Sequence, residues 1–130
     1  MSGAEVTDMT FGEYLKQCRK EKGMSIKQAA QAAGISASYL SSMERGSRTA
    51  PPFELLQTLA EVLGLDAEAC CRLYDLAAES KQPPALADDL AAYINRYPVL
   101  RSMLRCSMVY QLTEQDWETI MSYIKKNYFC

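Results

Sequence analysis

Apolar residues recur at helical spacing along most of the chain, and no stretch keeps the strict alternation of a half-buried strand. Phe11, Tyr14, Leu15 and Cys18 follow the i, i+3, i+4, i+7 pattern, which predicts an amphipathic helix from about residue 8 to residue 22, ending at Gly23. The same pattern predicts further helices over about residues 25–33, 37–45, 51–63, 67–79, 86–95, 98–109 and 114–127. We therefore expect an all-α protein.

The predicted helix ends carry residues that cap helices. Gln28 follows a serine at the spacing of a capping box, in which each side chain accepts a hydrogen bond from the other residue's backbone N–H. Gly34 and Gly46 stand where a left-handed residue ends a helix at the least cost. Pro51 and Pro52 are predicted to occupy the first turn of the helix over residues 51–63. The predicted N-caps are Ser25, Ser36, Asp66 and Thr113.

The segment SKQPP at residues 80–84 is the clearest interruption of the helical pattern, because its two prolines disfavour helix around them. We therefore predict a first domain over residues 1–79, a linker over 80–84 and a small helical extension over 85–130. An extension of this size is small for an independent core. We expect it to bury its apolar residues against a second copy of the chain as a homodimer. Packing on the first domain, or binding an unidentified protein partner or effector, stays open.

Composition excludes several functional classes. No run approaches the roughly 20 apolar residues that cross a bilayer, and the N-terminus lacks a signal-peptide pattern, so we expect a cytoplasmic protein without a membrane partner. The five cysteines form no C-x-x-C pair, which predicts reduced thiols and no metal site. The chain has no histidine, no Gly-rich phosphate loop and no obvious pair of catalytic carboxylates. We expect neither catalysis nor a cofactor.

Charge is distributed unevenly along the chain. Residues 11–50 hold seven basic and three acidic residues, a net charge of +4, whereas the rest of the chain carries −6. Such asymmetry is typical of a protein that presents one face to a polyanion. A random scatter of solvated charges is the alternative.

The predicted helices over residues 25–33 and 37–45 are joined by a tight turn that begins at Gly34. The stretch GMSIKQAAQAAGISASYLSSMERGSRTAP, residues 23–51, resembles the helix-turn-helix of the Cro/phage-repressor (XRE-like) family. The preceding FGEYLKQCRKEKG and the following FELLQTLAEVLGLD resemble the first and fourth helices of that family, so the resemblance covers about residues 9–79. It implies a five-helix, lambda-repressor-like domain that binds duplex DNA as a dimer, with its third helix in the major groove.

The resemblance also implies which residues meet DNA. Ile26 departs from the family, which commonly has a glutamine there that braces a phosphate. Base contacts would fall to short side chains of the third helix, which cannot form the bidentate pairs that long polar side chains make with bases. Specificity would then depend on close fit, water, DNA deformability and the following loop. The DNA-binding candidates are Lys27, Gln28, Ser36, Ala37, Ser38, Tyr39, Ser41, Ser42, Arg45, Ser47 and Arg48.

Three of these candidates have a second interpretation. Arg45 and Arg48 could be solvated surface charges. Tyr39 could pack its ring against the preceding helix and present its hydroxyl to a phosphate, as we expect, or could simply be a core residue. Arg19 and Glu44 match a pair that several family members join by a salt bridge, and we expect that pair to be structural.

Together these observations predict a sequence-specific transcriptional regulator that binds duplex DNA as a homodimer. The alternative is a helix-turn-helix module used mainly for protein contact, such as an antitoxin or a mobile-element accessory factor, with secondary DNA binding. The salt dependence of binding to random duplex separates the two hypotheses.

Overall fold

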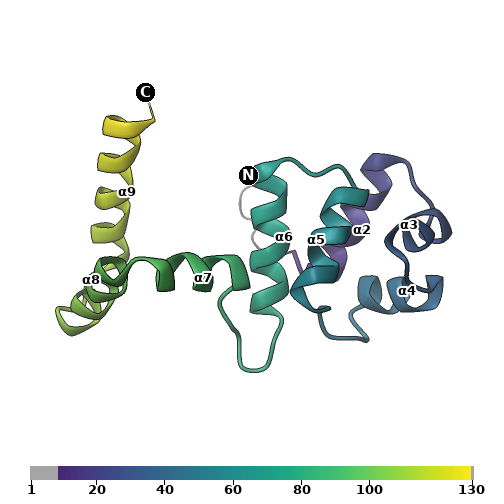
Figure 1. The fold of residues 1–130 in the computed structure, drawn as a ribbon, viewed down its shortest axis with the longest axis horizontal. Coiled ribbons are helices and arrows are strands. Elements are labelled where there is room, and N and C mark those ends of the chain that lie inside the picture. Colours follow the sequence, from purple (N-terminus) through teal and green to yellow (C-terminus); the bar gives the residue numbers. More distant parts are fainter. Residues whose placement is uncertain (1–8, 130) are drawn as a thin grey trace. The chain divides into compact units, whose positions relative to one another are not determined.

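The computed structural model describes residues 9–129, and within them every regular element is an α-helix (Figure 1). The prediction of an all-α fold is confirmed. No helix in this range is long and apolar enough to cross a membrane. The helices are α2 (Phe11–Lys22), α3 (Ile26–Ala33), α4 (Ala37–Arg45), α5 (Phe53–Val62), α6 (Ala67–Glu79), α7 (Asp88–Arg96), α8 (Pro98–Val109) and α9 (Glu114–Tyr128).

The chain divides into two compact units, one reaching to Leu90 and the other starting at Ala91. In the first unit, α2 packs against α4 and α6, α3 packs against α4 and α5, and α5 packs against α6. The largest fully buried side chains come from four of these five helices, so one core holds them together. They are Leu15, Leu40, Met43, Leu59 and Leu73. This packing fixes α3 and α4 side by side on the scaffold of α2, α5 and α6 (Figure 1).

Local capping sets the bounds of α3 and α4. The Ser25 Oγ accepts a hydrogen bond from the Gln28 N–H at 3.0 Å, and the Gln28 Oε1 accepts one from the Ser25 N–H at 2.8 Å. Gly34 and Gly46 end the two helices with φ of 76° and 79°, a left-handed conformation that strains any residue with a Cβ. The turn between α3 and α4 is therefore specified by its own residues.

Several predicted helix boundaries were wrong. Helix α2 begins at Phe11, because the side chain of Thr10 caps it in a capping box with Glu13. Residue 8, where we expected the start, lies outside the described residues. Helix α5 begins at Phe53, since Pro52 is the N-cap with an extended ψ of 157° and Pro51 precedes it. Helix α7 begins two residues later than predicted, after the buried Ala87, and α9 ends one residue later.

The N-terminal turn of α2 contacts the backbone at the end of α4 directly. A Cβ on Gly12 would lie 2.5 Å from the Met43 carbonyl oxygen and 2.6 Å from the Glu44 carbonyl oxygen. Because both neighbours are backbone atoms, a side chain at this position would push α4 away from α2. The absence of a side chain at Gly12 thus sets how closely α4 sits on the scaffold.

The segment after α6 folds back onto the end of that helix before α7 begins. The Ala85 N–H donates to the Ala78 carbonyl at 3.0 Å, and Ala87 is buried. Leu86, which we predicted within a helix, precedes α7 and is half exposed.

The second unit buries little of its apolar surface. None of the side chains of α7, α8 or α9 is buried. The N-terminus of α9 is nevertheless well formed, since Thr113 caps it in a capping box with Asp116. The hydrogen bonds from Thr113 hold the pKa of the Asp116 carboxyl below its usual value. The exposed apolar side chains from Ala91 onward include Tyr93, Val99, Met108, Val109, Tyr110, Met121, Tyr123, Tyr128 and Phe129.

The cysteines that the structure describes are free thiols: Cys18, Cys70, Cys71 and Cys106. Cys130 lies outside the described residues. Burial raises the pKa of the Cys18 thiol, which packs in the core of the first unit.

Candidate nucleic-acid interface

Helix α4 has one buried face and one exposed face. Leu40 and Met43 point into the core and are at most 1% exposed. On the opposite side, Ala37 and Ser38 at the N-terminal end and Arg45 at the C-terminal end are exposed. The exposed side chains of α4 are therefore free to contact a partner.

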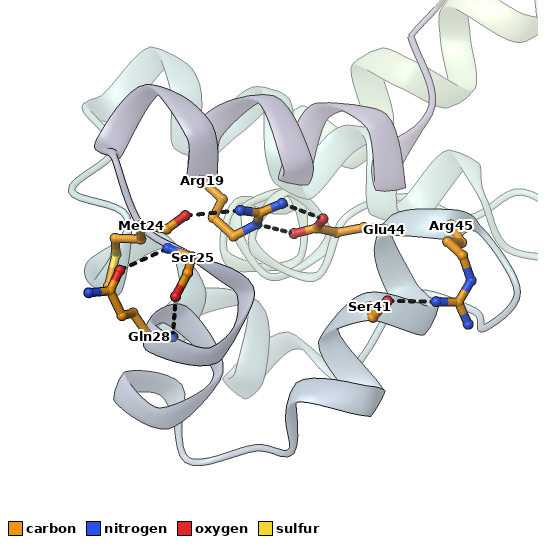
Figure 2. Close-up of polar contacts among 7 residues, drawn as sticks. All are labelled: Arg19, Met24, Ser25, Gln28, Ser41, Glu44 and Arg45. Carbon is orange, nitrogen blue, oxygen red and sulfur yellow. Dashed lines mark hydrogen bonds and ion pairs between the residues drawn. The ribbon is translucent and has the colours of Figure 1, made fainter.

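A buried ion pair joins α4 to α2. The Arg19 Nε donates to Glu44 Oε2 at 2.7 Å and its Nη2 donates to Glu44 Oε1 at 3.0 Å, while Nη1 donates to the Met24 carbonyl at 2.9 Å (Figure 2). The hydrogen bonds to Glu44 raise the pKa of the Arg19 guanidinium above its usual value. Both residues are less than 10% exposed, so they orient α4 and the turn before α3 rather than meet a ligand.

The start of α3 presents two of the predicted contact residues. Lys27 and Gln28 are both exposed. The amide oxygen of Gln28 is engaged in the capping box with Ser25 (Figure 2), so its NH₂ group remains as the donor for a ligand. The free backbone N–H groups of this helix N-terminus also favour an anion.

The hydroxyls of Ser36, Ser42 and Ser47, in α4 or beside it, hydrogen-bond within the protein. Ser36 accepts from the Tyr39 N–H at 3.0 Å, as predicted of an N-cap. Ser42 donates to the Ser38 carbonyl at 2.9 Å, and Ser47 donates to the Ser42 carbonyl at 3.2 Å. Ser42 and Ser47 therefore offer acceptor lone pairs rather than a free donor.

Two arginines near the C-terminal end of α4 are held by neighbouring side chains. The Arg45 Nη1 donates to the Ser41 Oγ at 2.6 Å (Figure 2). The Arg48 guanidinium lies over the ring of Tyr39, 5.4 Å from its centroid. All four residues were predicted to contact DNA. The Ser41–Arg45 contact follows from their i, i+4 spacing within α4, whereas the contact of Arg48 with Tyr39 depends on the path of the loop after α4, which no local pattern shows.

The predicted contact residues thus lie on three consecutive stretches: the start of α3, the exposed side of α4 and the loop after it. The charged members are Lys27, Arg45 and Arg48, all cationic, while the nearby Glu44 carboxylate is neutralised by its buried partner. Cations, helix N-termini and short polar side chains are the groups that contact DNA phosphates and base edges. Within residues 9–129 no cluster of acidic or cysteine side chains could hold a metal ion.

Comparisons with known proteins find related helix-turn-helix proteins. A family model described as Helix-turn-helix matches residues 15–69, from within α2 to the start of α6. The HTH-type transcriptional regulator SinR of Bacillus subtilis is 46% identical over 53 residues, which are 41% of this chain and 48% of SinR. The chain therefore spans about half the length of that relative.

A second relative matches over a greater length. The HTH-type transcriptional regulator DdrOP3 of Deinococcus deserti is 33% identical over 132 residues, covering 91% of this chain and 98% of DdrOP3. A solved structure of a SinR protein/SinI protein complex has a TM-score of 0.47 and 28% sequence identity, covering 89% of this chain and 95% of that chain. The match to DdrOP3 extends beyond the helix-turn-helix into the second unit.

Proposed function

The chain belongs to the helix-turn-helix family of transcriptional regulators, and on this premise we propose that it binds specific duplex DNA sites as a homodimer, with α4 in the major groove. Members of this family are DNA-binding regulators and not enzymes. The observation that carries the proposal is the exposed side of α4, which is flanked by the cations Lys27, Arg45 and Arg48.

The build of α4 supports its role as the recognition helix. Ala37 and Ser38, at the N-terminal end, are exposed and small, and N-terminal residues of a recognition helix are the ones that approach base edges. Their size lets the helix lie deep in the groove, where alanine contacts a thymine methyl and serine bonds a base edge. Lys27 and the N-terminus of α3 supply phosphate contacts beside it.

Selection of bound sites from a random DNA pool tests this proposal. We expect the recovered duplexes to share an inverted repeat whose half-sites are about 10 base pairs apart, or a multiple of that, because a two-fold symmetric dimer presents two copies of α4 to one face of the DNA. Recovery of no common sequence would contradict sequence-specific binding. A single half-site without a repeat would contradict the homodimer.

We propose that the helices of the second unit form the dimer interface. That unit leaves many large apolar side chains exposed, which single soluble chains rarely do over a contiguous surface. Two linked copies would cover these side chains and would double the number of phosphate contacts. In this proposal residues 1–79 form the DNA-binding domain, and residues 80–84 connect it to the extension over residues 85–130, which holds two chains together.

Sedimentation equilibrium of the full chain and of a Val109→Glu variant tests the interface. Val109 is 76% exposed at the end of α8, beside the exposed Met108 and Tyr110. We expect the parent to be a dimer and the variant to dissociate at least about tenfold more readily, because a charge would be buried without a partner. Gln115→Glu, at an exposed polar position of α9, is the matched control and should leave the dimer intact. A monomeric parent would contradict the proposal.

The exposed apolar side chains of the second unit also favour one alternative function. A helix-turn-helix module used mainly for protein contact would place a different protein on this surface and would bind DNA weakly or not at all. A chain that sediments as a monomer, and for which selection from the random pool recovers no common DNA sequence, would favour that alternative.

A further inference from the structure

Three hydroxyls on α4 or in the loop after it are already engaged within the protein. Ser42 and Ser47 donate their protons to backbone carbonyls, and the oxygen of Ser41 accepts a hydrogen bond from Arg45. Such a hydroxyl has fewer free groups to offer DNA, and where DNA replaces its existing hydrogen bond the net gain is small. The cationic side chains near α4 are therefore the stronger candidates for phosphate contacts.

The two arginines beside α4 retain most of their donors. A guanidinium has five N–H groups, and Arg45 uses one of them on Ser41. Arg48 is exposed, and its guanidinium lies over the Tyr39 ring, 5.4 Å from the centroid; this cation–π contact does not by itself use up the hydrogen-bond donors of the guanidinium. Both side chains are thus held in place while still able to bind an anion.

Tyr39 can hold Arg48 because its own ring is fixed. The ring is partly buried and packs against the core cluster of the first unit. The loop that carries Arg48 is also fixed, since the Ser47 N–H and Oγ both donate to the Ser42 carbonyl. A cation held between a fixed ring and a fixed loop loses less conformational freedom on binding than a solvated arginine does.

From these contacts we propose that Tyr39 is a positioning residue that presents the guanidinium of Arg48 to a DNA phosphate. This inference rests on the proposed DNA binding and deepens it. A phosphate is the partner because Arg48 follows the C-terminal end of α4, whereas base edges are approached by residues at the N-terminal end of a recognition helix. A guanidinium matches the oxygens of a phosphate with two parallel hydrogen bonds.

A double-mutant cycle on Tyr39 and Arg48 tests the proposal, with binding to a fixed duplex measured by fluorescence anisotropy over a range of salt. Arg48→Ala should weaken binding about fivefold and reduce the salt slope by about 1 for each bound chain, because one phosphate contact is lost. Tyr39→Leu should weaken binding about two- to fivefold, the range of an exposed cation–π contact. The double variant should bind no more weakly than Arg48→Ala alone.

Two further variants separate this role from simpler explanations. Tyr39→Phe keeps the ring and removes the hydroxyl, so it should fold and bind within about twofold of the parent. Lys81→Ala removes an exposed positive charge from the segment after α6, outside the predicted contact residues, and should reduce the affinity much less than Arg48→Ala does.

Two outcomes would overturn the inference while the parent still binds duplex. The first is a loss of affinity in Tyr39→Phe as large as that in Arg48→Ala, which would mean that the Tyr39 hydroxyl contacts DNA itself. The second is additivity of the Tyr39→Leu and Arg48→Ala effects. A parent that binds no duplex would overturn the proposed function as well.

Discussion

The Glu44→Ala variant is expected to lose about 3–5 kcal/mol of its free energy of unfolding, because Arg19 would remain buried without its carboxylate partner. The guanidinium of Arg19 makes two hydrogen bonds to Glu44 and one to the Met24 carbonyl. Once the carboxylate is removed, only the bond to Met24 remains to offset the desolvation of the charge. Solvent screening is weak, since both side chains are less than 10% exposed.

Urea denaturation followed by circular dichroism measures this loss, at one protein concentration for all variants. Arg45→Ala removes an exposed charge at the next position and is expected to change stability by less than about 0.5 kcal/mol. The double variant Arg19→Met, Glu44→Leu should recover much of the stability, because apolar residues of similar size often replace a buried ion pair without loss. A loss below about 1 kcal/mol in Glu44→Ala would show that the pair behaves as a surface salt bridge.

The Ser42→Glu variant is expected to bind duplex on the order of 100-fold more weakly than its parent, since a carboxylate on the exposed side of α4 would face the DNA phosphates. Ser42 is only partly exposed, and its hydroxyl bonds the Ser38 carbonyl within the same helix. Loss of that exposed hydrogen bond is partly offset by the better helix propensity of glutamate. The melting temperature should therefore stay close to that of the parent.

Two variants control for the effects of charge and of hydroxyl loss. Gln57→Glu adds the same charge at an exposed position of α5 and should reduce affinity only slightly. Ser42→Ala removes the hydroxyl alone and should bind nearly as well as the parent, because that hydroxyl is engaged within the helix. Equal binding by Ser42→Glu and its parent would show that α4 is not the recognition helix.

The sequence predicts the elements of this fold well because their ends are capped locally. Ser25 with Gln28, and Gly34 and Gly46, act on backbone groups within a few residues of themselves, so their spacing alone reports the turn between α3 and α4. The same kind of signal was overlooked at Thr10, where the T-x-x-E spacing to Glu13 marks the start of α2.

Contacts between distant segments could not be predicted from local pattern. The approach of Gly12 to the end of α4 depends on how two helices cross, and no neighbouring residue reports it. The cation–π contact of Arg48 with Tyr39 depends in the same way on the path of the loop after α4. The serines of α4 were predicted as base contacts from the family resemblance, whereas the hydrogen bonds of Ser41 and Ser42 became visible only in the folded helix.

Binding of random-sequence duplex as a function of salt is the most direct test of DNA binding through the face formed by α3, α4 and the following loop. The parent is expected to bind at low ionic strength, with log K falling linearly against log salt by about 0.9 for each phosphate contacted. Ser42→Glu, titrated beside it, should bind far more weakly at every salt concentration. Binding that does not respond to salt, or a parent that binds no duplex at low ionic strength, would contradict this account.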